Sequence, residues 1–245
     1  MNQSTRAEQV TVQATAGSIQ GRIKNGALLF AGIPYAKAPV ESLRFRPPQP
    51  LATFAEPYPA LKFSPAAPQI PSGGMTDNAP VRWSEDCLYL NISAPVEALE
   101  ANDSGDRAVM VWIHGGGYTS GQGAIPWYNG NRFAKNNDIV VVSINYRLGA
   151  LGFADLSHLG EEFATSNING TLDQIAALKW VQDNIAAFGG DPSRVTIAGE
   201  SAGGFSVATL MACPSAEGLF QQAIPQSGAC HHTLPQEASK RVTEH

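Results

Sequence analysis

The chain has 245 residues, of which 43% are hydrophobic and 15% are charged, a balance typical of a globular protein rather than a disordered one. The net charge of −5 offers no basic surface, so we expect no nucleic-acid partner. The first residues are polar and no apolar run approaches the ~20 residues of a membrane helix, so we expect a cytoplasmic protein without membrane contact. This length can form a single domain over residues 1–245.

The N-terminal part of the chain predicts a small antiparallel meander followed by a long loop. Three short strands are expected, at 10–14, 18–23 and 27–31. Gly17 separates the first two and Asn25-Gly26 the last two, as expected for hairpin turns. From Gly32 to about Pro80 the chain is rich in proline and lacks periodicity, which indicates a functional or covering loop region.

The rest of the chain alternates strands with helices. Strands are predicted at 87–93, 108–113, 139–145, 194–198 and 222–226. Apolar residues recur at helical spacing over 172–188, and Gly189-Gly190 ends that helix. A second helix is expected over 204–212. This alternation predicts an α/β fold whose central sheet is mostly parallel and covered on both faces, with the antiparallel strands at its N-terminal side.

The segment Gly199-Glu200-Ser201-Ala202-Gly203 reads G-x-S-x-G and lies between a predicted strand and a predicted helix. In that context the pattern indicates a nucleophile elbow, a strained turn that lifts a serine hydroxyl above the sheet. A turn without chemistry is the weaker alternative, because a glycine turn of this type needs no serine at its apex. Ser201 is therefore the predicted nucleophile, and the N–H of Ala202 is a predicted oxyanion donor. Glu200 would bias the catalytic imidazole, bind a water, or only form structural hydrogen bonds.

A second glycine-rich motif, His114-Gly115-Gly116-Gly117, directly follows a predicted buried strand. Its free N–H groups can point at a developing oxyanion, and it precedes the elbow in the order typical of lipases and esterases. His114 either touches substrate or holds the loop by bonding to backbone. It is a poor candidate for general base, because it precedes the serine and is tied to the loop.

A serine hydroxyl needs a base, usually a histidine oriented by a carboxylate, and in this fold both follow the serine in the chain. Few residues follow Ser201, and the internal histidines among them are His231 and His232. Adjacent residues of an extended segment point in opposite directions, so at most one of the two would face Ser201. Either could act as a surrogate base, line the pocket, or be solvated. The chain thus carries half of a predicted active site.

Pocket residues are harder to predict than the nucleophile. We expect the substrate pocket to include Tyr118, Trp127, Phe205 and His231, although packing explains the three aromatic residues equally well. The sequence has no metal-ligand spacing and no nucleotide-binding motif, so we expect neither a metal nor a cofactor. Its three cysteines show no C-x-x-C spacing and are expected to be buried, reduced thiols.

With these motifs in view, the chain resembles the type-B carboxylesterase family, which includes bacterial para-nitrobenzyl esterases and the cholinesterases. The resemblance covers essentially the whole chain beyond its first few residues. The stretches that carry it are 30–36 (FAGIPYA), 43–45 (LRF), 84–91 (SEDCLYLN), 111–117 (VWIHGGG), 145–149 (NYRLG), 172–174 (LDQ), 188–192 (FGGDP), 199–204 (GESAGG) and 226–228 (QSG).

The resemblance implies an α/β-hydrolase fold and serine-dependent hydrolysis of small-molecule carboxylic esters. Gly116, Gly117 and Ala202 would form the oxyanion hole. Two buried salt bridges are implied, Arg44 with Glu85 and Arg147 with Asp173. Family members are about twice as long, and their catalytic carboxylate and histidine lie beyond the point that matches residue 245. We therefore expect a C-terminally truncated domain whose ester hydrolysis is weak or absent.

Two alternatives remain at this stage. One is a non-catalytic binding or adhesion protein on the same fold, which Ser201 and the intact glycine loop argue against. The other concerns assembly, because the strand predicted at 222–226 would be left as an unpaired sheet edge. Such an edge predicts self-association or a complementing C-terminal polypeptide.

Overall fold

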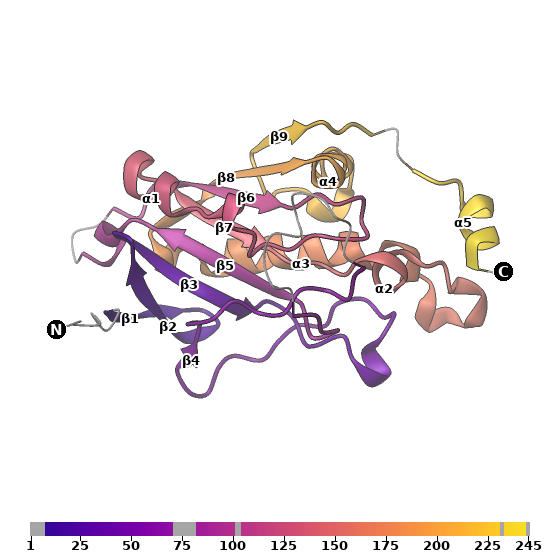
Figure 1. Ribbon diagram of the computed structural model, residues 1–245, viewed down its shortest axis with the longest axis horizontal. Coiled ribbons are helices and arrows are strands. Elements are labelled where there is room, and N and C mark those ends of the chain that lie inside the picture. Colours follow the sequence, from indigo (N-terminus) through magenta and orange to yellow (C-terminus); the bar gives the residue numbers. More distant parts are fainter. Residues whose placement is uncertain (1–7, 71–81, 101–103, 231–232, 244–245) are drawn as a thin grey trace.

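The computed structural model describes residues 8–70, 82–100, 104–230 and 233–243, and within these ranges one sheet of nine strands forms the centre of the molecule (Figure 1). The strands lie in the order β1-β2-β3-β5-β7-β6-β8-β9, with β4 paired to β2. Their bounds are β1 (Gln9–Ala14), β2 (Gly17–Lys24), β3 (Ala27–Pro34), β4 (Tyr58–Pro59), β5 (Tyr89–Ala94), β6 (Arg107–Ile113), β7 (Val140–Ile144), β8 (Gly190–Glu200) and β9 (Gln222–Gln226).

The first strands form the predicted meander. β1 pairs antiparallel with β2, and β2 with β3. Asn25 and Gly26 both have positive φ, 54° and 79°, as the two-residue turn between twisted strands requires. β3 continues antiparallel into β5, and β5 into β7. The N-terminal antiparallel part of the expected sheet is therefore confirmed.

The strands around the elbow form the parallel part of the sheet. β6 pairs in parallel with β7 and β8, and β8 pairs in parallel with β9. All of β7 is buried, and Val109, Val111 and Ile113 of β6 are at most 1% exposed. A strand buried in this way reads in sequence as an unbroken apolar run, and the sequence therefore predicted both β6 and β7.

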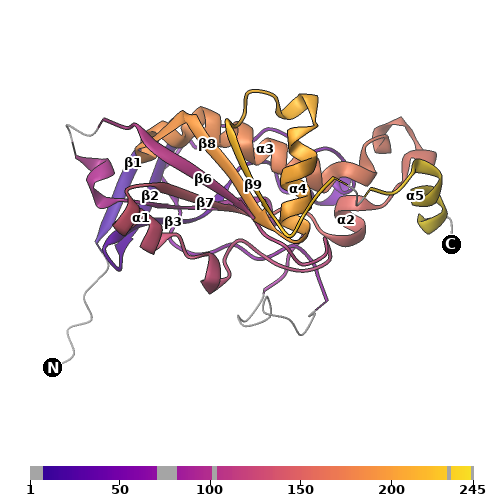
Figure 2. The same cartoon turned by 90° about the horizontal axis from the view of Figure 1, so that it is seen from above.

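The sheet carries helices on both faces, and Figure 2 shows them from above. Gly130, at the start of α1, lies against Val141, whereas Ile185, after α3, lies against Gly190 next to Val109. Val141 pairs with Met110, so the two side chains share one face of the sheet. Val109 is the neighbour of Met110 in β6 and points to the other face, so α1 and the end of α3 contact opposite faces. The α-helices are α1 (Asn131–Asn137), α2 (Gly149–Phe153), α3 (Asn169–Asn184), α4 (Ala202–Met211) and α5 (Gln236–Thr243).

Short 3-10 turns connect these elements. They are η1 (Glu41–Leu43), η3 (Val96–Leu99), η4 (Pro126–Tyr128), η5 (Ser157–Leu159), η6 (Glu161–Phe163), η7 (Ser166–Ile168), η8 (Ile185–Phe188) and η9 (Pro214–Ala216). The helix predicted over 172–188 starts earlier, at Asn169, and becomes 3-10 at Ile185 before Gly189 ends it at φ 77°. No helix of the described part is long and apolar enough to cross a membrane.

Some expectations are corrected. The predicted loop from Gly32 to Pro80 contains β4 and η1 in its described part, and β4 joins the sheet beside β2. The strand predicted at 87–93 is shifted to Tyr89–Ala94. Cys87 and Leu88 are apolar and buried, which made them read as strand residues, but they precede it. Of the three thiols only Cys87 is buried, while Cys230 is exposed.

The strand predicted at 222–226 has the expected bounds and position. β9 is the last strand of the order, and within the described residues it pairs with β8 alone. Its burial pattern is largely exposed, and Ile224 is 46% exposed. One edge of the parallel sheet is therefore open next to the strand that carries the elbow.

Candidate active site

Ser201 stands alone between a strand and a helix, as predicted for an elbow. β8 ends at Glu200 and α4 begins at Ala202. Ser201 itself has φ 56° and ψ −123°, a backbone conformation that residues other than glycine rarely adopt. The strain is about 1–3 kcal/mol. Its N–H donates to the Gln226 carbonyl at 2.9 Å, and its carbonyl accepts from the Phe205 N–H at 2.9 Å. The backbone on both sides therefore holds the serine in the strained turn.

The glycines of the elbow make room for neighbouring backbone. A Cβ on Gly199 would lie 2.7 Å from the Ile113 carbonyl oxygen, a distance that real Cβ atoms do not show. A Cβ on Gly203 would collide with the same oxygen, and one on Gly204 with the Gln226 carbonyl. The end of β6 and the end of β9 thus press on the elbow from two sides, and only glycine permits this approach.

The His114–Gly117 loop lies against this turn although it is distant in sequence. A Cβ on Gly115 would be 3.2 Å from the Ser201 Cβ and 2.5 Å from the Glu200 carbonyl oxygen. Gly116 and Gly117 have φ of 111° and 62°, which directs the loop away from the strand path. The register of β6 beside β8, with Ile113 opposite Gly199, explains the meeting. Both turns therefore extend from the same end of neighbouring parallel strands.

Ala202 is buried and is the first residue of α4. The first N–H groups of a helix have no partner within it, and the helix dipole favours negative charge there. The three predicted oxyanion donors thus belong to two turns that the structure brings together. Their assignment to an oxyanion hole remains a prediction.

His114 is 1% exposed and is held on every side. Its Nδ1–H donates to the Gly115 carbonyl at 2.8 Å, and its ring stacks on Tyr146 at 4.5 Å between centroids. The Tyr146 hydroxyl donates to the His114 carbonyl at 2.7 Å. Burial lowers the His114 pKa to about 4, so the ring is neutral at pH 7. This geometry favours the interpretation in which His114 holds the loop.

Glu200 extends from the elbow toward a small aromatic group. Its Oε2 would lie 3.2 Å from a Cβ on Gly115. Burial, and then the negative charge of Glu200, raises the pKa of Tyr128, whose ring lies 5.1 Å from that of Trp112. The side chain of Glu200 therefore faces the glycine loop and Tyr128 at the edge of the site.

The base for Ser201 is not found in the described part of the chain. There His114 is tied to the loop, and His158 is exposed in η5. His231 and His232 lie outside the described residues. Their predicted roles, as surrogate base or pocket residue, stay predictions.

In a comparison with sequence models of protein families, the model of the carboxylesterase family matches residues 8–244. The chain belongs to the carboxylesterase family. It is 45% identical over 225 residues to para-nitrobenzyl esterase of Bacillus subtilis, covering 91% of this chain and 44% of that protein. To carboxylesterase 1D of Mus musculus it is 43% identical over 236 residues, covering 89% and 40%.

Solved structures give the same family and fix the fold. Carboxylesterase EST55 of Geobacillus stearothermophilus at pH 6.2 matches with a TM-score of 0.87 and 44% identity, covering 96% of this chain and 47% of that one. The fold is therefore that of an α/β-hydrolase, as the resemblance implied. The chain spans less than half the length of these relatives.

The aromatic residues predicted to line the pocket of this carboxylesterase-family chain differ in position. Tyr118 is half-buried directly after the glycine loop, and Phe205 is half-buried on α4, one turn after Ser201. Trp127 is 71% exposed in η4, next to Tyr128. Tyr118 and Phe205 thus adjoin the two turns in sequence, and all three remain predictions as pocket residues.

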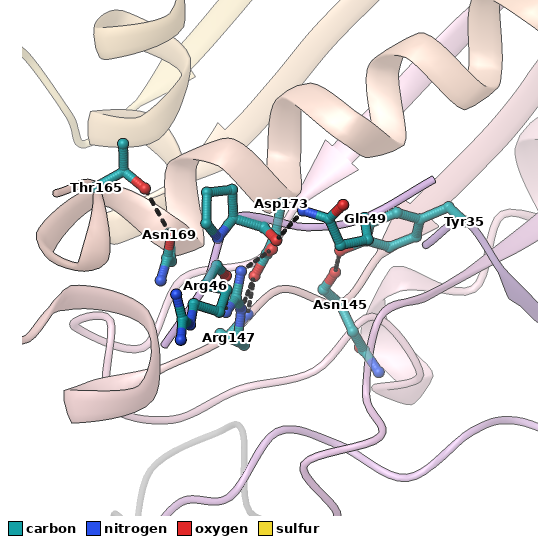
Figure 3. Close-up of polar contacts among 9 residues, drawn as sticks. Tyr35, Arg46, Gln49, Asn145, Arg147, Thr165, Asn169 and Asp173 are labelled. Carbon is teal, nitrogen blue, oxygen red and sulfur yellow. Dashed lines mark hydrogen bonds and ion pairs between the residues drawn. The ribbon is translucent and has the colours of Figure 1, made fainter. Parts of the chain in front are cut away.

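The ion pair implied between Arg147 and Asp173 is present and buried, with side chains 2% and 0% exposed. The Arg147 guanidinium donates one hydrogen bond to each carboxylate oxygen of Asp173, of 2.8 Å and 2.7 Å (Figure 3). Arg147 also donates through its backbone N–H to Asp173 and through its side chain to the Arg46 carbonyl. The pair joins the start of α3 to the chain after β7.

The second implied pair, Arg44 with Glu85, is present but not buried. Its two hydrogen bonds are 2.6 Å and 2.9 Å long, while the side chains are 41% and 29% exposed. The expectation of burial is corrected, because Arg44 follows η1 in the covering loop and stays within reach of solvent.

Sequence reasoning missed several residues that support the glycine loop. Tyr146 lies within the quoted stretch 145–149 but carried no predicted role, although its ring and hydroxyl both hold His114. Gln174 lies within the quoted stretch 172–174 but carried no predicted role, and Ser206 was not singled out, because their hydrogen bond joins two helices. A polar residue on a mostly apolar helix was a further signal for Gln174.

Proposed function

We propose that this protein hydrolyses small-molecule carboxylic esters through an acyl-enzyme on Ser201. The observation that carries the proposal is the strained serine at the end of β8, with the His114–Gly117 loop packed against it. Relatives named para-nitrobenzyl esterase and carboxylesterase 1D support esters as the substrate class. A cytoplasmic location stays a prediction from the polar first residues.

In this mechanism the Ser201 oxygen attacks the ester carbonyl carbon while a base takes the hydroxyl proton. The carbonyl oxygen becomes negatively charged and accepts hydrogen bonds from the N–H groups of Gly116, Gly117 and Ala202. Each such donor is worth roughly 2.7–4 kcal/mol in the transition state. The C–O bond to the alcohol then breaks as the base returns its proton, and water hydrolyses the acyl-serine in a second, matching step. The reaction needs no cofactor.

We further propose that the base reaches Ser201 from polypeptide that joins the sheet at β9. The edge there is open within the described residues, and the Gln226 carbonyl at its end already accepts from Ser201. A strand added in parallel beside β9 would have its carboxyl end on the same side of the molecule as the elbow. Ligands of α/β sheets bind outside the carboxyl ends of the strands. In this proposal a complementing C-terminal polypeptide supplies that strand. Without it, ester hydrolysis by residues 1–245 should be very slow, although residual catalysis by an oxyanion hole reaches ~10³–10⁴-fold over water.

The test compares the 245-residue chain with its Ser201→Ala variant. Each is assayed for p-nitrophenyl ester hydrolysis and for labelling by a fluorophosphonate, which bonds covalently to a reactive serine. Both assays are repeated after co-expression with the part of the Bacillus subtilis para-nitrobenzyl esterase that lies outside the matched region. We expect Ser201 to be the labelled residue and co-expression to raise both rates. Equal hydrolysis by the wild type and Ser201→Ala under both conditions would reject the serine mechanism.

Fast, stoichiometric labelling of the 245-residue chain alone would instead show that it contains its own base. That outcome would keep the serine mechanism and reject the complementing polypeptide.

A further inference from the structure

Tyr118, the residue after the glycine loop, has a backbone conformation that needs external support. Its φ is 61°, in the left-handed region where a bulky residue is strained. Such a conformation persists only where the surroundings over-determine it. Because Tyr118 directly follows Gly117, whatever holds Tyr118 also fixes the direction of the loop.

One support acts on the backbone of Tyr118. Its carbonyl accepts a hydrogen bond of 2.7 Å from the Gly149 N–H. Gly149 begins α2 and lies two residues after Arg147, which forms the buried ion pair with Asp173. The carboxylate of Asp173 thus holds, through Arg147, the short segment that binds the carbonyl of Tyr118.

A second support acts on the hydroxyl of Tyr118. Gln174 donates from Nε2 to the Ser206 oxygen at 2.9 Å, and the Ser206 hydroxyl donates to the Tyr118 oxygen at 3.4 Å. Gln174 and Ser206 are 0% and 3% exposed, so water does not compete for these groups. Ser206 accepts from Gln174 through its oxygen, so its single proton is available for the donation to Tyr118.

Both supports of Tyr118 start from α3, and one of them also reaches α4. Asp173 and Gln174 are neighbours on α3, and they reach opposite ends of the same tyrosine. Ser206 also lies on α4, which begins at Ala202. The hydroxyl path therefore ties the loop that carries Gly116 and Gly117 to the helix that carries the remaining oxyanion donor.

We propose that Asp173 and Gln174 act through Tyr118 as positioning residues for the oxyanion loop, and that the Ser206 hydroxyl links the loop to α4. The inference rests on the proposed function, since it gives these groups a role in aligning the donors. The Tyr118 ring packs against Phe153 at 5.0 Å between centroids, and a phenylalanine would keep that contact. The hydroxyl is the part of Tyr118 that the inference requires.

The first experiment measures fluorophosphonate labelling of Ser201 in the full chain, with the complementing polypeptide if that raises the rate. Tyr118→Phe and Ser206→Ala are compared with the wild type. A matched control is Thr209→Ala, because Thr209 lies on the same helix and its hydroxyl donates only to Phe205 backbone. We expect the maximal labelling rate of both variants to fall about tenfold, with the probe half-saturation concentration unchanged. Tyr118→Phe should keep the melting temperature of the wild type, whereas Ser206→Ala should lower it, because the buried Gln174 amide loses its acceptor. The double variant should fall no further than either single one.

The second experiment does not depend on reactivity. Hydrogen exchange, followed by mass spectrometry, measures the peptide that contains residues 115–119. We expect faster exchange there in Tyr118→Phe and Ser206→Ala, and unchanged exchange in Thr209→Ala. Exchange and labelling that match the wild type in both variants would overturn the inference. If the wild type labels no better than Ser201→Ala, the proposed function fails, and the exchange data still decide whether the two groups hold the loop.

Discussion

The elbow and the glycine loop meet at Ser201, but they are held in different ways. Gly203 of the elbow lies directly against the Ile113 carbonyl, and Gly204 against the Gln226 carbonyl. The loop has little of this backbone contact at Gly117, where a Cβ would meet its nearest atom at 3.8 Å. Around Gly117 the loop is held instead by the Tyr146 hydroxyl on the His114 carbonyl and by two hydrogen bonds on Tyr118, one from the Gly149 backbone and one from the Ser206 hydroxyl.

This difference separates the two functions of the proposed site. A nucleophile must stay in one strained geometry, and close-packed sheet backbone provides a rigid frame. Oxyanion donors must be aligned with an atom of the substrate, and alignment by side chains can be adjusted by single substitutions. We therefore expect elbow substitutions to affect folding and substitutions at the Gly117–Tyr118 end of the loop to affect reactivity.

The largest effect is expected from Asp173→Ala, which removes the partner of a buried cation. Arg147 would remain 2% exposed with an uncompensated charge, at a cost of about 3–5 kcal/mol in the free energy of unfolding. Urea denaturation of the 245-residue chain measures this. Glu85→Ala is the control, because its pair with Arg44 is partly exposed and contributes little to stability. Similar losses in both variants would contradict the contrast between the pairs.

A somewhat smaller effect is expected from Gly203→Ala. The new methyl group collides with the Ile113 carbonyl, and neither backbone can move without disturbing β6 or α4, so we expect a loss of about 3 kcal/mol. Gly117→Ala adds the same methyl group to the loop, where its nearest neighbour is the Thr119 hydroxyl at an ordinary contact distance of 3.8 Å. It should lose only about 1–2 kcal/mol, from its positive φ of 62°. Equal unfolding free energies for the two variants would show that the elbow is no more tightly packed than the loop.

The smallest effect is a pH dependence from His114. Its pKa is about 4 in the folded protein against 6.5 for an unperturbed histidine, so the unfolded chain binds the proton more readily. Stability from this group is complete above pH 6.5 and is lost as the pH falls toward 4. Between pH 7 and pH 5 the loss is about 2 kcal/mol. Urea denaturation of the wild type and His114→Gln at both pH values isolates it, and parallel losses would exclude His114 as the cause.

Much of this site could be predicted because its signals are local. The glycines around Ser201 and those after His114 each follow a recognisable strand, and the hairpin at Asn25-Gly26 needs two positive φ values in a row. Their chemistry is written in consecutive residues. The parallel register that brings Ile113 beside Gly199 then follows from the order of strands and helices.

The features that escaped prediction depend on tertiary contacts. α1 reads Asn131-Arg132-Phe133-Ala134-Lys135-Asn136-Asn137, which has no apolar period, and it forms because it packs on the sheet. The supports of Tyr118 come from Gly149 and Ser206, and no spacing in the sequence connects these positions. The exposure of Arg44 likewise depends on the path of the covering loop.

The strand order also has a consequence for biosynthesis. β6 lies between β7 and β8 in space but precedes both in the chain, so its two edges are filled at different times. β7 follows soon after, whereas β8 is complete only when Glu200 has left the ribosome. At about 5–20 residues per second, several seconds pass in which a highly apolar strand keeps one bare edge. Nascent chains of this protein should therefore bind ribosome-associated chaperones most strongly between the synthesis of β7 and that of β8.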